Sequence, residues 1–239
     1  MIALIDSDLV CYRCAASAEQ EPLEIALERA DSLIERILYE TKANAWKAFL
    51  TGSNNFRNDI NPQYHANRKD KPKPKWLQEL REHLVLGWQA TISDGNEADD
   101  EMAIAQTNDT VICSIDKDLL QVPGKHYNFV KNEHYEISEH KGWQNFYFQM
   151  LMGDSSDNIF GFDGKARPKV PKFLEPKVEY LFSLETPYEM YEYLYGLYEE
   201  HGSNHWKEDF EMNAHCLYLQ RSIGDKWQPP EKPHDLSQG

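Results

Sequence analysis

Carboxylates recur in this chain at positions that favour chemistry over a merely solvated surface. Asp6 follows the apolar run at residues 2–5, and Asp116 and Asp118 follow a predicted strand at residues 110–115. Such runs are typical of buried parallel strands, whose carboxyl ends meet at one edge of a sheet and commonly bind ligands there. Two further groups complete the set: Glu97, Asp99 and Asp100 after a glycine-containing loop, and Asp154 and Asp157 at the start of a predicted helical region.

The expected chemistry of these acids is metal binding. Many carboxylates in a small volume repel one another and raise their own pKa values unless cations neutralise them. Hard divalent cations such as Mg²⁺ or Mn²⁺ are the natural counter-charge. Two such ions about 3.5–4 Å apart can activate water and stabilise the leaving oxygen in phosphodiester hydrolysis. A solvated helix start or an N-cap is the better explanation of any single pair of acids, but four groups at strand ends or loops favour the metal site.

The elements that would position these acids alternate between strand and helix. Strands are predicted at residues 2–5, 46–51, 88–92, 110–115 and 126–130, with helices at 9–18, from 22, at 74–86 and from 97. This alternation predicts an α/β fold with a mostly parallel sheet flanked by helices. From residue 142 the chain is predicted to be helical, with helices at 143–151, 188–200 and 209–221 and a loose tail at 225–239.

The distribution of charged residues along the chain is more informative than the net charge. A net charge of -15 would ordinarily argue against nucleic acid, because backbone binding depends on neutralising phosphates. Residues 57–81, however, hold seven Arg or Lys against three acids, and residues 161–177 hold five against two. Each basic segment could be a solvated face, but the second lies directly after the Asp154 and Asp157 pair. Acid beside base at a tight turn suggests a metal site that touches a phosphate backbone.

Composition places the chain among globular proteins. With 239 residues and 41% hydrophobic content, it can bury a sizeable core. No window approaches 18 uncharged apolar residues, and the amino terminus lacks a basic leader, so we expect no membrane span and a cytoplasmic location. Four cysteines do not make a disulfide framework in a chain of this size.

In combination, four motifs resemble the structure-specific 5'-nucleases, closest to the bacteriophage 5'-3' exonuclease branch of the flap endonuclease family. They are Val111-Ile-Cys-Ser-Ile-Asp-Lys-Asp118, Glu97-Ala-Asp-Asp100, Gly153-Asp-Ser-Ser-Asp-Asn-Ile159, and Phe56-Arg57 with Tyr64-His-Ala-Asn-Arg68. The resemblance implies a PIN-like nuclease domain at 1–140, with a flexible arch near 53–75. It also implies a helical DNA-binding part at 141–224 that contains a helix-three-turn-helix.

The resemblance further implies residue roles. The metal ligands would be Asp6, Glu97, Asp99, Asp100, Asp116, Asp118, Asp154 and Asp157, with Asp116 as the bridging carboxylate. The catalytic residues beside the scissile phosphate would be Arg68, His65 and Lys69. DNA would contact Arg57, Tyr64, Lys71, Lys73, Gly161, Gly164, Lys165, Arg167 and Lys169. The implied cofactors are two Mg²⁺ ions, for which Mn²⁺ substitutes, and K⁺ at the helix-three-turn-helix is left open.

The implied activity is 5'-3' exonuclease and flap endonuclease cleavage in phage replication or recombination. Substrates would be DNA with 5' ends, flaps or nicks, with RNA-DNA hybrids left open, and no protein partner is implied. Three features depart from the family pattern. No Asp occurs at residues 51–55, His65 stands where a Lys is usual, and Pro168 and Pro171 follow an altered glycine pattern at residues 161–167.

Two other functions fit part of the sequence. Ile5-Asp-Ser-Asp-Leu-Val10 matches the opening motif of haloacid dehalogenase-type phosphatases, in which Asp6 would be the nucleophile and Asp8 the general acid. That interpretation leaves the acids at 97–100 and 116–118 and the basic segment at 57–81 unexplained. The departures from the family pattern, chiefly the absent second-strand Asp and His65, would suit a DNA-structure-binding protein with an impaired metal site.

Overall fold

The structure is a computed structural model that describes residues 1–68 and 71–233 and divides them into two compact units. Of the described residues, 1–56, 71–138 and 219–224 form the first unit, and 57–68, 139–218 and 225–233 form the second. Two short segments therefore belong to one unit although the residues on both sides of them in the sequence belong to the other. They are 57–68 in the second unit and 219–224 in the first.

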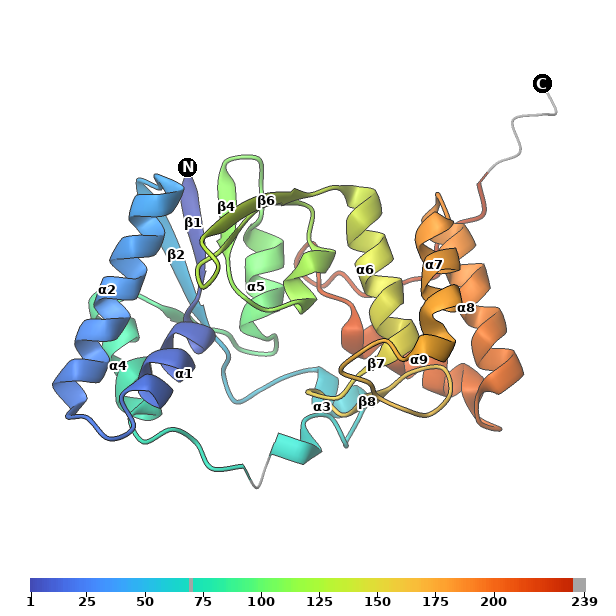
Figure 1. Ribbon diagram of the computed structural model, residues 1–239, viewed down its shortest axis with the longest axis horizontal. Helices are drawn as coiled ribbons and strands as arrows, with labels where there is room; N and C mark the ends of the chain where they lie inside the picture. Colours follow the sequence, from blue (N-terminus) through green and yellow to red (C-terminus); the bar gives the residue numbers. More distant parts are fainter. Residues whose placement is uncertain (69–70, 234–239) are drawn as a thin grey trace. The chain divides into compact units, whose positions relative to one another are not determined.

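The first unit is built on a mostly parallel sheet, as the alternation of elements predicted. Its described residues form six strands in the order β3-β2-β1-β4-β5-β6 (Figure 1). The strands are β1 (Ile2–Asp6), β2 (Ala45–Leu50), β3 (Thr91–Ile92), β4 (Thr110–Cys113), β5 (Gly124–Asn128) and β6 (Glu133–Ile137). Strand β1 pairs in parallel with β2 and β4, whereas β6 returns antiparallel to β5.

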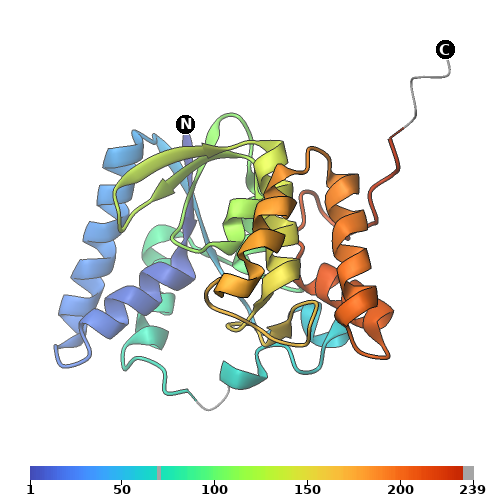
Figure 2. The same cartoon turned by 45° about the vertical axis from the view of Figure 1, so that its right-hand side comes forward.

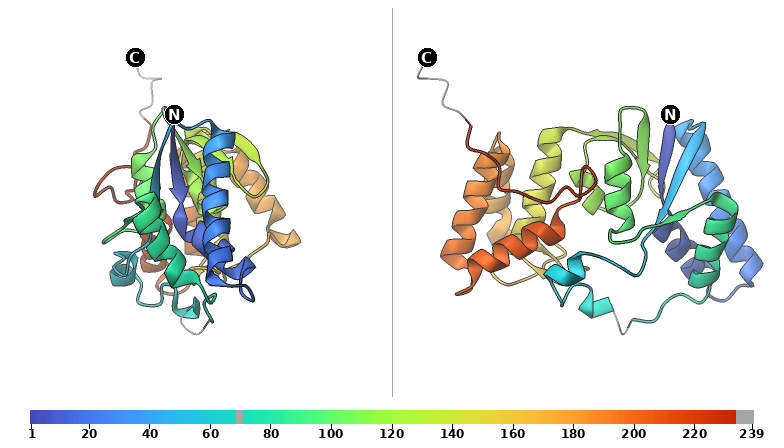
Figure 3. Two further views of the ribbon diagram at one scale, coloured as in Figure 1. Left: turned by 90° about the vertical axis from the view of Figure 1, so that its left-hand side faces the viewer. Right: turned by 180° about the vertical axis from the view of Figure 1, so that it is seen from behind.

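Helices cover both faces of this sheet. Ala3 and Ile5 of β1 pack in the same core as α1 (Ser7–Ser17), α2 (Leu23–Thr41) and α4 (Leu77–Trp88). Leu4, on the opposite face, packs with α5 (Ala98–Ala105), which comes forward in the view from behind (Figure 3). Burial on both faces explains why residues 2–5 of β1 and 111–113 of β4 are all apolar, without a polar alternation.

Two predictions for the first unit are corrected by the structure. Helix α4 continues through Trp88 and ends at Gln89, whose φ of 54° is left-handed. The strand predicted at 88–92 is therefore reduced to Thr91 and Ile92. Strand β6 was not predicted, because its polar sequence, Glu-His-Tyr-Glu-Ile, lacks a continuous apolar run.

The second unit is helical, as predicted. Its main helices are α6 (Glu139–Met152), α7 (Glu175–Ser183), α8 (Pro187–His201) and α9 (Trp206–Leu217), and α6 packs against the other three (Figure 2). Phe146, Met150 and Leu194 are fully buried in its core. Trp227 is also buried there, so the start of the tail, which was predicted to be loose from residue 225, packs against the core. Residues 234–239 of that predicted tail lie outside the described residues.

The segment between α6 and α7, where the resemblance implies a helix-three-turn-helix, is rich in turns. Strands β7 (Gly153–Asp154) and β8 (Ile159–Phe160) pair antiparallel, and the short helix η3 (Lys172–Leu174) leads into α7. A Cβ at Gly153 would lie 2.5 Å from the Gly161 backbone nitrogen, and one at Gly161 would lie 2.4 Å from the Leu151 carbonyl oxygen. Only glycine fits at these two positions.

The predicted arch region begins with two short helices. These are α3 (Arg57–Ile60) and η1 (Ala66–Arg68), which belong to the second unit.

Among the described residues, no helix has the length and hydropathy required to cross a membrane.

Candidate active site

The carboxylates of the first unit lie where the strand order of the sheet reverses. From β1 the chain passes to β2 on one side, and β4 lies on the other side of β1. Ligands of such sheets bind beyond the carboxyl ends of the strands at this switch point. Asp6 is the last residue of β1, and Asp118 opens the short helix η2 (Asp118–Gln121) after β4. Helix α5, which carries Asp99 in its first turn, packs against β1.

A buried serine joins two of these acids. The Ser114 hydroxyl donates to Asp6 Oδ2 at 2.6 Å and accepts from the backbone N–H of Asp116 at 2.9 Å. Asp6 Oδ1 accepts from the Leu9 N–H, and Asp116 Oδ1 accepts from the Asp118 N–H. Ser114 was missed by the sequence analysis. Its place between an apolar strand and an acidic pair is the signal that could have identified it.

The pKa values show that these acids act on one another. Burial raises the pKa of Asp6 to about 7 against the hydrogen bonds from Ser114 and Leu9, and the negative charges of Asp8 and Asp116 add to the rise. Burial also raises the pKa of Asp99 well above its ordinary value. There the charges of neighbouring carboxylates reinforce the effect; in decreasing order they are Asp116, Asp6, Glu97 and Asp118. We call Asp6, Glu97, Asp99, Asp116 and Asp118 the acidic cluster.

The donor set of the acidic cluster suits hard divalent cations. All its side-chain donors are carboxylate oxygens, the ligands that Mg²⁺ and Mn²⁺ prefer. A cation among them would relieve the mutual repulsion that raises the pKa of Asp99. Within the described residues, no three His, Cys, Asp or Glu side chains are arranged to hold a single ion. The fit therefore rests on the type of donor and on the electrostatics.

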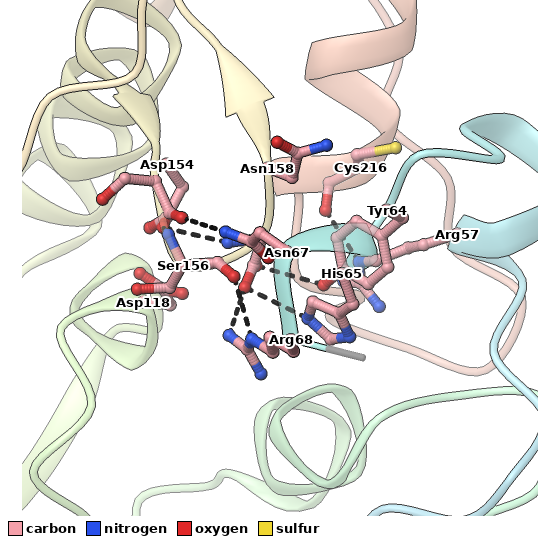
Figure 4. Close-up of polar contacts among 12 residues, drawn as sticks. Arg57, Tyr64, His65, Asn67, Arg68, Asp118, Asp154, Ser156, Asn158 and Cys216 are labelled. Atoms are coloured by element: carbon pink, nitrogen blue, oxygen red, sulfur yellow. Dashed lines mark hydrogen bonds and ion pairs between the residues drawn. The ribbon is translucent and has the colours of Figure 1, made fainter. Parts of the chain in front are cut away.

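A second group of predicted residues meets within the second unit. Asp157 Oδ1 lies 2.5 Å from Arg68 Nη2 and 3.1 Å from His65 Nε2, while Asp157 Oδ2 accepts from the Tyr64 hydroxyl at 3.1 Å. Figure 4 shows Tyr64, His65 and Arg68 together, with the Arg68 side chain directed toward Ser156. Arg68 Nε also donates to the Ser156 carbonyl at 2.8 Å. We call these residues, Tyr64, His65, Arg68 and Asp157, the Asp157 cluster.

The electrostatics of the Asp157 cluster are opposite to those of the acidic cluster. Burial alone would raise the pKa of Asp157, but the hydrogen bond from His65 and the positive charge of Arg68 outweigh it and hold that pKa below its ordinary value. Nearby, Asp154 Oδ1 accepts from the backbone N–H groups of Ser156 and Asp157. Here both acids shape the 154–157 turn and hold the segment at 64–68. Their role as metal ligands stays a prediction.

The family model of the 5'-3' exonuclease N-terminal resolvase-like domain matches residues 1–147, which is more than half of the chain. The chain belongs to this family. Thermostable DNA polymerase I of Thermus caldophilus is 24% identical to it over 197 residues, which are 73% of this chain and 24% of the polymerase. This exonuclease-family chain thus spans about a quarter of the length of that curated relative.

Solved structures from bacteriophage T5 share the fold. A flap endonuclease complex with DNA and metal ions superposes with a TM-score of 0.56 at 16% identity, covering 89% of this chain and 98% of the phage chain. A 5'-exonuclease with bound zinc gives a TM-score of 0.56 at 17% identity, covering 91% and 99%. These likenesses confirm the α/β sheet flanked by helices and the helical C-terminal part.

In this exonuclease-family chain, the Asp100 side chain has a structural role that the sequence analysis did not predict. Its side chain is fully buried, with Oδ2 accepting from the Glu97 N–H at 3.1 Å and Oδ1 from the Gln220 N–H at 3.2 Å. Both carboxylate oxygens therefore accept hydrogen bonds from backbone N–H groups, one at the start of α5 and one in the segment at 219–224. Its role as a metal ligand stays a prediction.

Asp8 is likewise committed to structure. It forms an ion pair with Arg81, and its Oδ2 accepts from the Thr51 N–H at 2.7 Å. Arg81 also donates to the Thr51 carbonyl, and the Thr51 hydroxyl accepts from the Ala98 N–H. Thr51 thus connects α1, α4 and α5 at the end of β2. Arg81 and the Thr51 N–H thus occupy the carboxylate that a phosphatase would use as its general acid, which disfavours the phosphatase interpretation.

Four of the predicted DNA-binding residues are held by contacts within the chain, and their role in DNA binding stays a prediction. Arg57 is 1% exposed, and its guanidinium donates to the carbonyls of Cys216 and Tyr218. Three others are held in similar ways: the buried Tyr64 donates to Asp157, Gly161 is buried with its N–H bonded to the Lys165 carbonyl, and Arg167 is paired with Asp163. None of these four groups can reach a phosphate without breaking the contacts that hold its segment in place.

The remaining predicted DNA-binding residues lie on the surface. Lys71 and Lys73 are exposed on the first unit, and Lys165 and Lys169 on the second. Gly164 is also exposed, and its positive φ of 70° shapes the turn in which its N–H donates to the Gly161 carbonyl. Lys69 lies outside the described residues. The exposed lysines can make the phosphate contacts that the buried arginine cannot.

Removing the Ser114 hydroxyl should impair the acidic cluster. We expect Ser114→Ala to lower the rate of metal-dependent DNA cleavage about 10- to 100-fold, because residues that orient metal-binding side chains have effects of that size. The expected signature is a higher Mg²⁺ concentration for half-maximal rate. Ser138→Ala, a hydroxyl deletion elsewhere in the first unit, is the control. An unchanged Mg²⁺ dependence in Ser114→Ala would contradict the role assigned to this hydroxyl.

Proposed function

We propose that this chain is a divalent-metal-dependent 5' nuclease that hydrolyses phosphodiester bonds at the 5' ends or flaps of DNA. The observation that carries the proposal is the acidic cluster at the carboxyl ends of β1 and β4, in which burial and neighbouring charges raise the pKa values of Asp6 and Asp99. Membership of the 5'-3' exonuclease family supports the same reaction class. The T5 flap endonuclease complex with DNA and metal ions supports the same classes of ligand.

The acidic cluster would hold the cations. When bound, divalent ions would supply Lewis-acid activation of water and of the scissile phosphate. Asp116 is the central ligand in this proposal because its charge raises the pKa of both Asp6 and Asp99. Ser114 would hold Asp6 and Asp116 in fixed relative positions through its two hydrogen bonds. We propose two Mg²⁺ ions, with Mn²⁺ as a substitute, and a K⁺ ion at the helix-three-turn-helix stays a prediction.

The Asp157 cluster would supply a positioned cation to the DNA. Arg68 is 48% exposed, and its Nε and Nη2 are fixed by the Ser156 carbonyl and Asp157. A guanidinium held in this way loses little side-chain entropy when its remaining N–H groups bind a phosphate oxygen. His65 lies beside it on the same carboxylate. In this proposal Asp157 orients Arg68, and the exposed lysines bind phosphates farther along the DNA.

The biological setting is part of the proposal. A nuclease of this kind would remove RNA primers or degrade DNA from its 5' ends in phage replication or recombination, within the cytoplasm of a host cell. Nicked duplexes and RNA-DNA hybrids are further candidate substrates. The balance between exonuclease and endonuclease cleavage would follow from which of these DNA ends the protein binds best.

Cleavage of labelled oligonucleotides tests the proposed function. The purified chain is incubated with a 5'-flap duplex, a nicked duplex and a blunt duplex, with Mg²⁺ or with EDTA. We expect products with a 5'-phosphate and a 3'-hydroxyl from the flap and nick substrates, complete loss in EDTA, and recovery with Mg²⁺ or Mn²⁺. DNA binding without cleavage at any metal concentration would overturn the proposal in favour of a DNA-structure-binding protein.

A small phosphomonoester substrate tests the phosphatase alternative. Turnover of p-nitrophenyl phosphate with no DNA cleavage would replace the nuclease proposal by a phosphatase. We expect no turnover, because Arg81 and the Thr51 N–H occupy the Asp8 carboxylate that a phosphatase would need as its general acid.

A further inference from the structure

A basic groove on the first unit has no part in the function described so far. It is a cavity of about 930 Å³ between α1 and α2, and Ile115 completes its wall. Three arginines line it, Arg13, Arg29 and Arg36, together with a single acid, Glu28. We call this cavity the arginine groove. Such a concentration of positive charge stands out in a chain whose net charge is -15.

The arginines of the groove keep their charge available for a ligand. Arg29 Nη1 donates to the carbonyl and the hydroxyl of Ser17, and Arg36 Nη2 donates to the Phe129 carbonyl at 2.9 Å. These neutral acceptors orient the two guanidinium groups without cancelling their charge. Within the described part of the chain, Arg13 forms no hydrogen bond or ion pair. Guanidinium groups oriented in this way suit phosphate oxygens.

Apolar side chains line the same cavity. Leu9, Tyr12, Ile25 and Ile115 contribute to it, and Tyr12 and Ile115 are 49% and 37% exposed. Arginines beside an exposed aromatic ring are the combination that binds single-stranded nucleic acid, with phosphates on the cations and bases stacked on the ring. A duplex hides the faces of its bases and offers only its phosphates. The mixed lining therefore favours a single strand over a duplex.

The position of the groove connects it to the acidic cluster. Ile115 directly precedes Asp116, and the Leu9 N–H donates to Asp6 Oδ1 at 3.0 Å. The groove wall is thus connected to the acidic cluster by one peptide bond, at Ile115, and by one hydrogen bond, from Leu9. We infer that the arginine groove binds a single-stranded segment of the DNA substrate, adjoining the part that lies at the acidic cluster. This inference rests on the proposed function for the nature of the substrate.

Binding without cleavage tests the inference. Fluorescence anisotropy in EDTA compares a duplex that carries a single-stranded 5' arm with the same duplex made blunt. We expect Arg13→Gln/Arg36→Gln to weaken binding of the armed duplex about fivefold or more and to change binding of the blunt duplex less than about twofold. The slope of log Kd against log salt for the armed duplex should fall by about 1.4, the value for two lost contacts to single-strand phosphates.

Matched controls separate a local effect from a change in overall charge. Lys47→Gln/Lys131→Gln removes the same charge from exposed residues outside the groove; Lys47 shares the α5 face of the sheet with its register partner Leu4. Tyr12→Ala provides an independent variant that leaves the charge unchanged and should also weaken binding of the armed duplex only. Equal losses on both DNAs, or equal losses in the lysine control, would overturn the inference. Because EDTA prevents metal-dependent cleavage, this result is independent of whether the proposed nuclease activity is found.

Discussion

Replacing Asp116 by Asn is expected to lower the rate of Mg²⁺-dependent cleavage by at least about a hundredfold while DNA affinity in EDTA stays within about twofold. Even residues that only orient a metal ligand contribute 10- to 100-fold, and Asp116 is proposed to hold the ions directly. The substitution is conservative in structure. An Asn Oδ1 can still accept from the Asp118 N–H, and the Asp116 N–H still reaches Ser114.

Stability separates the catalytic role of Asp116 from a structural one. Because Asp116 raises the pKa values of Asp6 and Asp99, removing its charge relieves repulsion in the cluster. Urea unfolding in EDTA should therefore show an unchanged or higher midpoint for Asp116→Asn. Asp109→Asn, at an exposed acid of the same unit, is the matched control and should alter neither rate nor midpoint. A cleavage rate that survived in Asp116→Asn would exclude the acidic cluster as the metal site.

Arg57→Ala should be the most destabilising of the arginine substitutions in the second unit. We expect the free energy of unfolding of that unit to fall by about 3 kcal/mol or more, because the change opens a cavity and removes the buried guanidinium that donates to the carbonyls of Cys216 and Tyr218. Far-ultraviolet circular dichroism and tryptophan fluorescence during urea unfolding would measure the loss. Trp143, Trp206 and Trp227 report on the second unit.

Arg68→Ala is the matched comparison, since Arg68 is also an arginine of the predicted arch. Its side chain is half exposed, so its removal should change the free energy of unfolding by no more than about 1 kcal/mol. Cleavage of the 5'-flap duplex should nevertheless fall, because Arg68 is proposed to act on the phosphate. The opposite pattern, a stable Arg57→Ala with weakened DNA binding, would restore the DNA contact that the resemblance implied for Arg57.

The fold was predictable where burial alone decides the sequence. Strands β1 and β4 are covered on both faces, and their continuous apolar runs identified them without knowledge of their partners. Strand β6, at the edge of the sheet, has no such signature and was missed. The end of α4 was also misplaced. It depends on the left-handed conformation of Gln89, a residue that does not mark a helix end as glycine does.

The acids were predictable for a similar reason. Asp6 and Asp116 end or follow strands whose parallel arrangement could be inferred, and the topology of such sheets brings those ends together. Ser114 could not be assigned from its type alone, since a serine after a strand has many ordinary roles. Its function becomes evident only when one hydroxyl is seen to meet both Asp6 and the backbone of Asp116.

The sequence by itself determined the reaction class that we propose, because carboxylates at strand ends and the order of the motifs depend on residue type and spacing. Tertiary structure decided which charged residues are available for that reaction. Arg57 and Arg68 look equivalent in the sequence, yet one is bonded to buried carbonyls and the other is half exposed. Asp100 and Asp116 differ in the same way, since one caps a helix and the other faces fellow carboxylates. Burial and hydrogen-bond partners come from segments distant in the chain, and no local pattern records them.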